Sequence, residues 1–199
     1  MKQSVRSVSL RNSACLFSVL ALVACGQPES EDAIEGLPEP IFTLPTDDER
    51  TAQAVDPTQL AKFRTDLLLA VNNARKVART CGTTAYPAVP ALTANAKLDT
   101  SSQVHAANMA SKNFFSHTGL DGKSPFDRMK AAGYNFSYAG ENIAAGNSTV
   151  AATMTQWLTS AGHCANIMNK NFTQIGFGYD YGATSTYKHY WVQNFGKPL

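Results

Sequence analysis

The sequence predicts one α+β domain at its C-terminal end, in which helices flank a small antiparallel sheet. Apolar residues recur at helical spacing in three segments, 57–78, 98–114 and 150–158. In the last part of the chain they instead alternate with glycines and polar residues, which is typical of strands. Residues 57–199 are enough for one hydrophobic core and too few to suggest two domains.

Each predicted helix has its own signal. The first helix, residues 57–78, begins with Asp56 as its cap and Pro57 in its first turn. Its apolar stripe consists of Leu60, Phe63, Leu67, Leu68 and Val71. The second helix repeats this pattern over residues 98–114, and the third covers residues 150–158 and ends near the Ser-Ala-Gly sequence that follows.

The sheet is predicted from two regions. Residues 138–145 indicate a short strand between the second and third helices. Residues 174–181 and 186–195 indicate a β-hairpin whose turn covers residues 182–185, where Gly182 begins a run of small residues. No internal repeat accompanies these elements.

Residues 1–24 predict a signal peptide. Three bases and no acid precede an apolar run, 14–24, that is too short to cross a bilayer as a permanent helix. The run ends in Leu22-Val23-Ala24-Cys25-Gly26, which resembles the bacterial lipobox, so we expect Cys25 to be lipidated. An ordinary secretory signal is the alternative, which changes anchoring without changing export. Gly26 stands where Asp would signal inner-membrane retention, and this favours the outer membrane in a Gram-negative cell.

Residues 25–56 predict a disordered acidic tether behind the lipidated Cys25. The segment holds four prolines and nine acidic residues against a single arginine, with apolar residues only in ones and twos. A flexible coil of this length would place its ends about 30 Å apart. That distance is enough to hold a domain clear of a lipid surface.

The domain itself is basic. Residues 57–199 contain 13 Lys and Arg against 6 Asp and Glu, although the whole chain has a net charge of only +2. This excess favours anionic partners such as lipid headgroups or cell-wall polymers. The alternative is that the acidic tether merely neutralises the domain. No nucleic-acid-binding motif is present, so we do not expect nucleic acid as a partner.

The cysteines predict one disulfide. Cys15 leaves with the signal peptide and Cys25 carries the lipid, so the mature domain retains Cys81 and Cys164. Two thiols in an oxidising compartment usually pair. We therefore expect the bond Cys81–Cys164.

A set of ordered motifs extends from Leu60 to Gly196. It comprises Asn72-Asn73-Ala74-Arg75, Phe115-Ser116-His117, Arg128 with Ala132-Gly133-Tyr134, Gly140-Glu141-Asn142-Ile143-Ala144, Trp157-Leu158-Thr159-Ser160, Gly162-His163-Cys164-Ala165-Asn166, Ile175-Gly176-Phe177-Gly178 and Tyr190-Trp191-Val192-Gln193-Asn194-Phe195-Gly196. In this order the chain resembles the CAP superfamily, also called the SCP or cysteine-rich secretory protein domain, in its bacterial form. The resemblance implies a three-layer α-β-α sandwich.

The resemblance also implies a cavity lined by His117, Glu141 and His163. Eukaryotic members carry a second Glu where this chain has Ser160, so we expect a three-residue site with Ser160 beside it. Two imidazoles and a carboxylate can hold zinc and leave a position for water. A histidine pair held only by hydrogen bonds is the alternative. The three residues lie on separate segments, so only the fold could bring them together.

Ser160 and His163 are three residues apart, which would suit a nucleophile and its base on a continuous helix. Gly162 argues against that continuation, so we expect the Ser160 hydroxyl to bond to the backbone at a helix end. No catalytic residue is assigned on this evidence.

Several other residues have structural interpretations. We expect His105 to be partly buried with its hydrogen bonds satisfied, and His189 to be structural or exposed. Trp157 and Trp191 are expected in the core. Arg128 is expected either to pair near Asp127 or to point into solvent.

Three classes of function follow. The first is a binding module of the cell envelope that takes a lipid, a wall fragment or another small ligand. The second is a metal-dependent hydrolase in which Glu141 and the histidines activate water. The third is a structural or adhesive lipoprotein. Binding is favoured, because the basic domain and the resemblance both support it.

Overall fold

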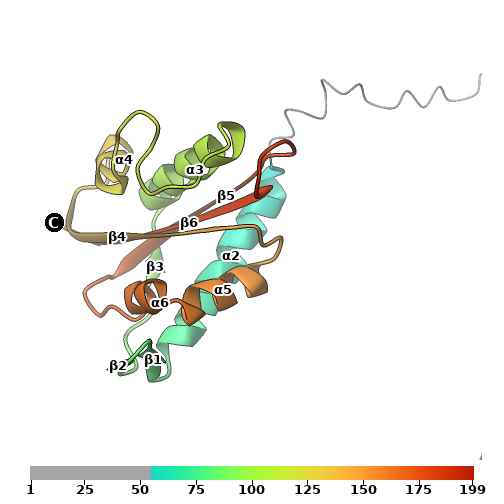
Figure 1. Cartoon of the computed structure of the whole chain (residues 1–199). Helices are drawn as coiled ribbons and strands as arrows, with labels where there is room; N and C mark the ends of the chain where they lie inside the picture. Colours follow the sequence, from blue (N-terminus) through green and yellow to red (C-terminus); the bar gives the residue numbers. More distant parts are fainter. Residues whose placement is uncertain (1–54) are drawn as a thin grey trace, which may run out of the picture. The chain divides into compact units, whose positions relative to one another are not determined.

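A four-stranded sheet separates two layers of helices in the computed structural model, which describes residues 55–199 (Figure 1). Helices α3 (Ala96–Ser111) and α4 (Pro125–Ala131) cover one face of this sheet. Helices α2 (Pro57–Arg75), α5 (Val150–Thr159) and α6 (Ala161–Ile167) cover the other. The α+β class and the α-β-α sandwich are therefore confirmed.

The central sheet has the order β3-β5-β6-β4, and β3 runs parallel to β5 while the other pairs are antiparallel. A separate two-stranded hairpin, β1-β2, follows helix α2. The strands are β1 (Arg79–Cys81), β2 (Thr84–Tyr86), β3 (Thr93–Ala94), β4 (Phe136–Ala145), β5 (Gln174–Tyr181) and β6 (His189–Pro198). Strand β4 lies at the edge of the sheet, so groups from both helical layers can reach its open side.

The predicted signal peptide, Cys25 and nearly all of the predicted tether lie outside the described residues. Among residues 55–199, no helix has the length and apolar character that crossing a membrane requires.

Some element limits differ from those expected. Helix α2 ends at Arg75, not at residue 78, because the chain turns there into β1 after the Lys76 N–H bonds to the Asn72 carbonyl. Strand β6 begins at His189, not at residue 186. The connecting loop closes through a hydrogen bond from the Gly182 N–H to the Lys188 carbonyl, with Lys188 at a φ of 64°.

Two short helices were not predicted. Helix α4 begins at a capping box formed by Ser124 and Asp127. Helix α6 begins directly after Ser160, whose extended backbone separates it from α5. The Ser160 side chain makes no capping hydrogen bond, so the expected bond from its hydroxyl to the backbone is wrong.

Side chains along each strand alternate between the two faces of the sheet, so a hydrophobic core forms on each face. On β6, Trp191 and Phe195 pack toward α2, α5 and α6, while Tyr190 and Val192 pack toward α3. On β5, Gly178 lets α3 lie directly on the strand, because a Cβ there would come within 2.3 Å of the Ser102 backbone. This close contact fixes the height of α3 above the sheet.

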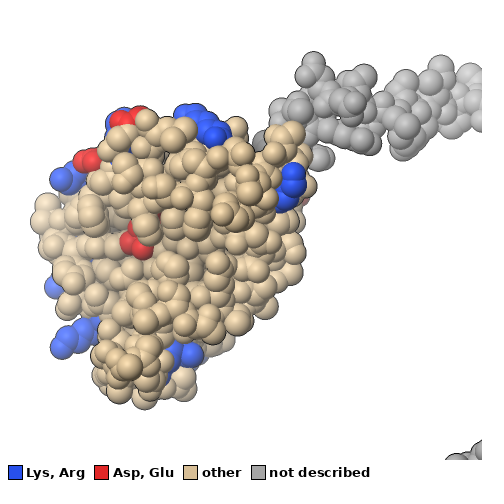
Figure 2. Space-filling view, viewed as in Figure 1, with Lys and Arg blue, Asp and Glu red and all other residues tan. Residues whose placement is uncertain are grey.

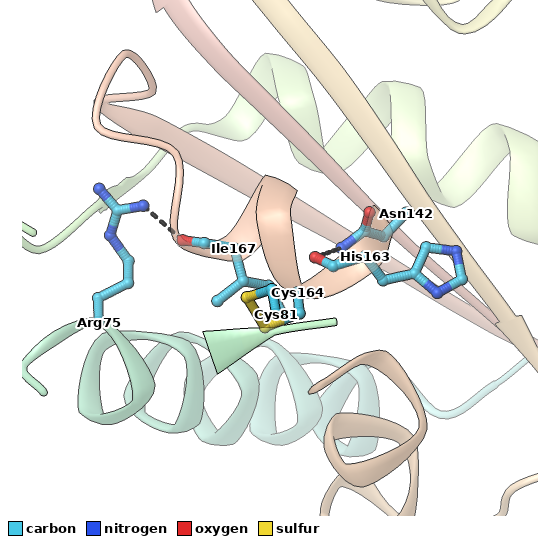
Figure 3. Close-up of a disulfide and its surroundings, with 6 residues drawn as sticks. All are labelled: Arg75, Cys81, Asn142, His163, Cys164 and Ile167. Atoms are coloured by element: carbon cyan, nitrogen blue, oxygen red, sulfur yellow. Dashed lines mark hydrogen bonds between the residues drawn. A yellow bond between two sulfur atoms is a disulfide. The ribbon is translucent and has the colours of Figure 1, made fainter. Parts of the chain in front are cut away.

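The predicted disulfide is confirmed. Cys81 and Cys164 are bonded with their Cα atoms 5.4 Å apart, which ties hairpin β1-β2 to helix α6 (Figure 3). The buried Arg75 holds the same helix from α2, since its Nη1 donates to the Ile167 carbonyl at 2.6 Å. Helix α6, which carries His163, is thus held at its middle by the disulfide and at its C-terminal end by Arg75.

Candidate functional site

A buried carboxylate on strand β4 organises the site. Glu141 and Ile143 project from β4 toward α3, whereas Asn142 and Ala144 project toward α5 and α6. The Glu141 side chain is only 1% exposed. Its Oε1 lies 2.8 Å from His117 Nδ1 and its Oε2 lies 2.8 Å from Arg128 Nη2. Both carboxylate oxygens are therefore engaged.

Arg128 is the residue that the sequence interpretation missed. It lies on α4 with its side chain 8% exposed, and it neither pairs with the neighbourhood of Asp127 nor points into solvent. Its guanidinium donates to Glu141 and to the carbonyls of His117 and Lys123, at 2.9 Å and 3.0 Å respectively for the carbonyls. One side chain thus fixes both the carboxylate and the loop that carries His117.

A third group approaches Glu141 from strand β6. The Asn194 amide nitrogen lies 3.1 Å from Glu141 Oε2 in the orientation that satisfies both ends of this amide. Its oxygen then accepts from the hydroxyls of Ser101 and Ser102 on α3. The carboxylate is consequently held by an imidazole, a guanidinium and an amide, as a buried charge requires.

The imidazole of His117 is oriented by this arrangement. Glu141 Oε1 can only accept, so His117 Nδ1 carries the proton of their hydrogen bond. In the neutral ring Nε2 is then unprotonated and can accept a hydrogen bond or bind a metal. The His117 side chain is 51% exposed, so a ligand can reach it.

His163 belongs to the opposite helical layer and is linked to β4 through Asn142. Asn142 Nδ2 donates to the His163 carbonyl at 3.1 Å, and Asn166 Nδ2 donates to Asn142 Oδ1 at 2.8 Å. Figure 3 shows the His163 ring pointing away from the disulfide. Burial lowers the pKa of His163, and repulsion from His117 lowers it further.

The structure therefore brings His117, Glu141 and Arg128 together, and the inclusion of His163 in this cluster stays a prediction. Within residues 55–199 no hydrogen bond or ion pair joins the His163 side chain to His117 or Glu141. Ser160 lies at the junction of α5 and α6, immediately before the helix that carries His163, and makes no hydrogen bond to the cluster in this part of the chain.

Whether this site can bind a metal depends on which side-chain atoms are not already hydrogen-bonded within the protein. In the described part of the chain, no group of three or more His, Cys, Asp or Glu side chains is arranged to hold a metal ion. Glu141 is already bonded through both oxygens, so it suits the role of a partner that orients His117. Zinc binding by His117, Glu141 and His163 stays a prediction, and His117 Nε2 is a ring nitrogen that a metal could use.

Two further histidines have structural roles. His105 is fully buried, not partly buried as expected, and its Nε2 must donate to the Ser116 carbonyl, 2.8 Å away, because a carbonyl only accepts. Its Nδ1 has no hydrogen-bond partner among residues 55–199, so the expectation that its hydrogen bonds are satisfied is also wrong. Burial lowers the pKa of His105, which keeps this ring neutral. His189 Nδ1 lies 2.8 Å from the Tyr179 hydroxyl. Trp157 and Trp191 are fully buried, as expected.

The positive charge of the domain is not gathered on one visible face. In Figure 2 the Lys and Arg side chains are scattered around the margin of the molecule, and most of the surface between them is uncharged. On the face shown, Lys and Arg do not form one cluster, and the absence of a nucleic-acid partner stays a prediction.

Comparisons with known proteins place this geometry in context. A family model described as "CAP: Cysteine-rich secretory protein family" matches residues 68–195. The chain is 44% identical over 82 residues to the uncharacterized protein YkwD of Bacillus subtilis, a match that covers 41% of this chain and 32% of that protein. The chain therefore spans about a third of the length of this relative.

Solved structures show the same fold. An extracellular protein of Bacillus anthracis that contains an SCP domain is similar with a TM-score of 0.54 and 24% identity, over 73% of this chain and 45% of that one. An outer surface protein of Borrelia burgdorferi is similar with a TM-score of 0.58 and 19% identity, over 73% of this chain and 98% of that one. At these identities the likeness establishes the fold alone.

Proposed function

Since this chain belongs to the cysteine-rich secretory protein family, we propose that its domain is a binding module of the bacterial cell envelope that takes a small ligand at His117 and His163. The ligand is a wall fragment, a lipid headgroup or a molecule of similar size. The basic character of residues 57–199 supports an anionic ligand.

The observation that carries this proposal is the state of Glu141. A general base or nucleophile needs a carboxylate oxygen that can reach the reacting proton or atom. Both oxygens of Glu141 are instead bonded inside the protein, and it is the only glutamate in residues 57–199. Glu141 is therefore suited to orienting His117 rather than to reacting, which favours binding over hydrolysis.

A metal-dependent hydrolase is the second candidate. It is favoured by the carboxylate on His117 Nδ1, because histidines that ligate a metal commonly donate their other ring nitrogen to such a group. Bound zinc would supply a Lewis acid that activates water. In that case His117 and His163 would hold the ion, and Glu141, fixed by Arg128, would orient the His117 ring.

Export and lipid anchoring through Cys25 complete the proposal. The apolar N-terminal run and the lipobox support them, and the names of the two structural neighbours describe an extracellular and an outer surface protein. The acidic tether would then hold the domain in reach of wall polymers. The alternative that the experiment must exclude is a structural or adhesive lipoprotein that binds no ligand.

The test is native mass spectrometry of the full chain purified from membranes, followed by calorimetric titration. The probes are zinc chloride, a soluble muropeptide mixture and dihexanoyl phosphatidylglycerol. We expect at least one muropeptide or lipid to bind the wild type and to lose affinity in His117→Ala, but not in the control His189→Gln. If no probe binds, or if both variants bind equally well, the proposal is wrong. Heat measured on titration with zinc chloride, together with hydrolysis of a peptide, would support the hydrolase instead.

A further inference from the structure

A cavity lies between helices α3 and α4 and the loop 112–124 that connects them. Its volume is about 220 Å³, and none of His117, Glu141 and His163 lines it. Figure 1 shows α3, α4 and their connecting loop on the same side of the sheet. Arg128 separates the two sites, since it lines this cavity while its guanidinium bonds to Glu141. The cavity is thus distinct from the histidine site.

The charges around this cavity leave one positive charge in excess. Arg128 is paired with Glu141, which does not line the cavity. Lys123 is paired with Asp121, since its Nζ lies 3.7 Å from Asp121 Oδ2. Lys112 has no ion pair and no side-chain hydrogen bond in the described part of the chain. A ligand that carries one negative charge would therefore balance the site, and Lys112 and Lys123 are the groups that would receive it.

The neutral part of the wall combines apolar contact with unused hydrogen-bonding groups. Val104, Leu120 and Ala132 supply small apolar surfaces. Asn108 is half-buried, and its side-chain amide, which can both donate and accept, has no partner among residues 55–199. His105 belongs to the same wall, and its buried Nδ1 is an acceptor that also lacks a partner in this part of the chain. These groups are complementary to an amide.

We propose that this cavity binds the free C-terminal carboxylate of a peptide whose last residues are small and apolar. The carboxylate pairs with Lys112 and Lys123, the terminal amide bonds to Asn108, and the methyl groups contact Val104 and Leu120. Two sources share this chemistry: the D-amino-acid stem peptides of the cell wall and the C-termini of ordinary proteins. The site does not depend on the function proposed for His117 and His163.

The experiment uses ligand-observed NMR titration of the full chain in detergent with four probes. They are N-acetyl-D-Ala-D-Ala, N-acetyl-L-Ala-L-Ala and the C-terminal amide of each. We expect the acids to bind at least tenfold more tightly than their amides, because a charge-assisted hydrogen bond is lost in the amide. Higher salt should weaken the acids alone. Preference for the D,D probe assigns the wall as the source, and preference for the L,L probe assigns protein C-termini.

Variants locate the site. Lys112→Gln should weaken the acids about fivefold to tenfold, and Ala132→Leu should weaken them by narrowing the cavity. The matched control Lys130→Gln removes a lysine on α4 that does not line the cavity and should leave affinity unchanged. Equal affinity for acids and amides, no binding at all, or equal effects of the two lysine variants would overturn the proposal. Loss of binding in His117→Ala would assign the peptide to the histidine site and overturn it as well.

Discussion

Replacing Arg128 should lower the free energy of unfolding more than replacing a charged side chain on the surface does. The side chains of Arg128 and Glu141 are 8% and 1% exposed, so Arg128→Met would leave the carboxylate buried without its cation. Breaking one partner of a buried ion pair costs about 3 to 5 kcal/mol. Small domains have about 5 to 15 kcal/mol of stability in total, so this variant would lose a large share of its free energy of unfolding.

The assay is urea unfolding at neutral pH with the slope of the transition compared between variants. The matched control is Lys62→Met, which breaks an exposed pair with Asp66 whose side chains are 71% and 41% exposed. That change should cost at most about 0.5 kcal/mol. The double variant Arg128→Met/Glu141→Gln should be more stable than Arg128→Met, because it no longer buries an unpaired charge.

A loss in Arg128→Met as small as that in Lys62→Met would refute this reasoning. So would a double variant that is no more stable than the single one. Either result would mean that water reaches Glu141 in the folded protein and compensates for the missing guanidinium.

Three further predictions concern other parts of the chain. The free energy of unfolding should fall as pH drops below about 6.5, because burial lowers the pKa of His105 in the folded protein. Below that pH the unfolded chain binds a proton at His105 that the folded chain does not, which favours unfolding. His105→Gln should flatten this pH dependence when urea titrations are repeated at several pH values. Replacing both Cys81 and Cys164 by Ala should lower stability by about 4 to 5 kcal/mol in the chain-entropy account, measured as a shift of the urea midpoint, and an unchanged midpoint would contradict it. Cys25→Ser should release the chain from membranes or leave it as precursor, whereas flotation with vesicles after a high-salt wash would count against the lipobox.

Much of the fold could be predicted because its signals are local. The apolar stripe of α2, the alternation along β5 and the cap at Asp56 each act over a few residues. The disulfide was predicted by elimination, since only Cys81 and Cys164 would remain free to pair once Cys15 leaves with the predicted signal peptide and Cys25 carries the predicted lipid. The contact between His117 and Glu141 was expected from the resemblance to a known family, not from spacing, because 24 residues separate them in the chain.

The role of Arg128 was decided only by the tertiary structure. Its neighbours in sequence, Asp127 above all, offered a local partner, but the capping box at the start of α4 engages Asp127 with Ser124. Arg128 points inward to Glu141, 13 residues away on an edge strand. Sequence determines which residues can be charged, capped or apolar, because these properties belong to single side chains and short segments. Which charges share a buried site depends on how helices and strands pack, since desolvation and pairing arise only between segments that the fold brings together.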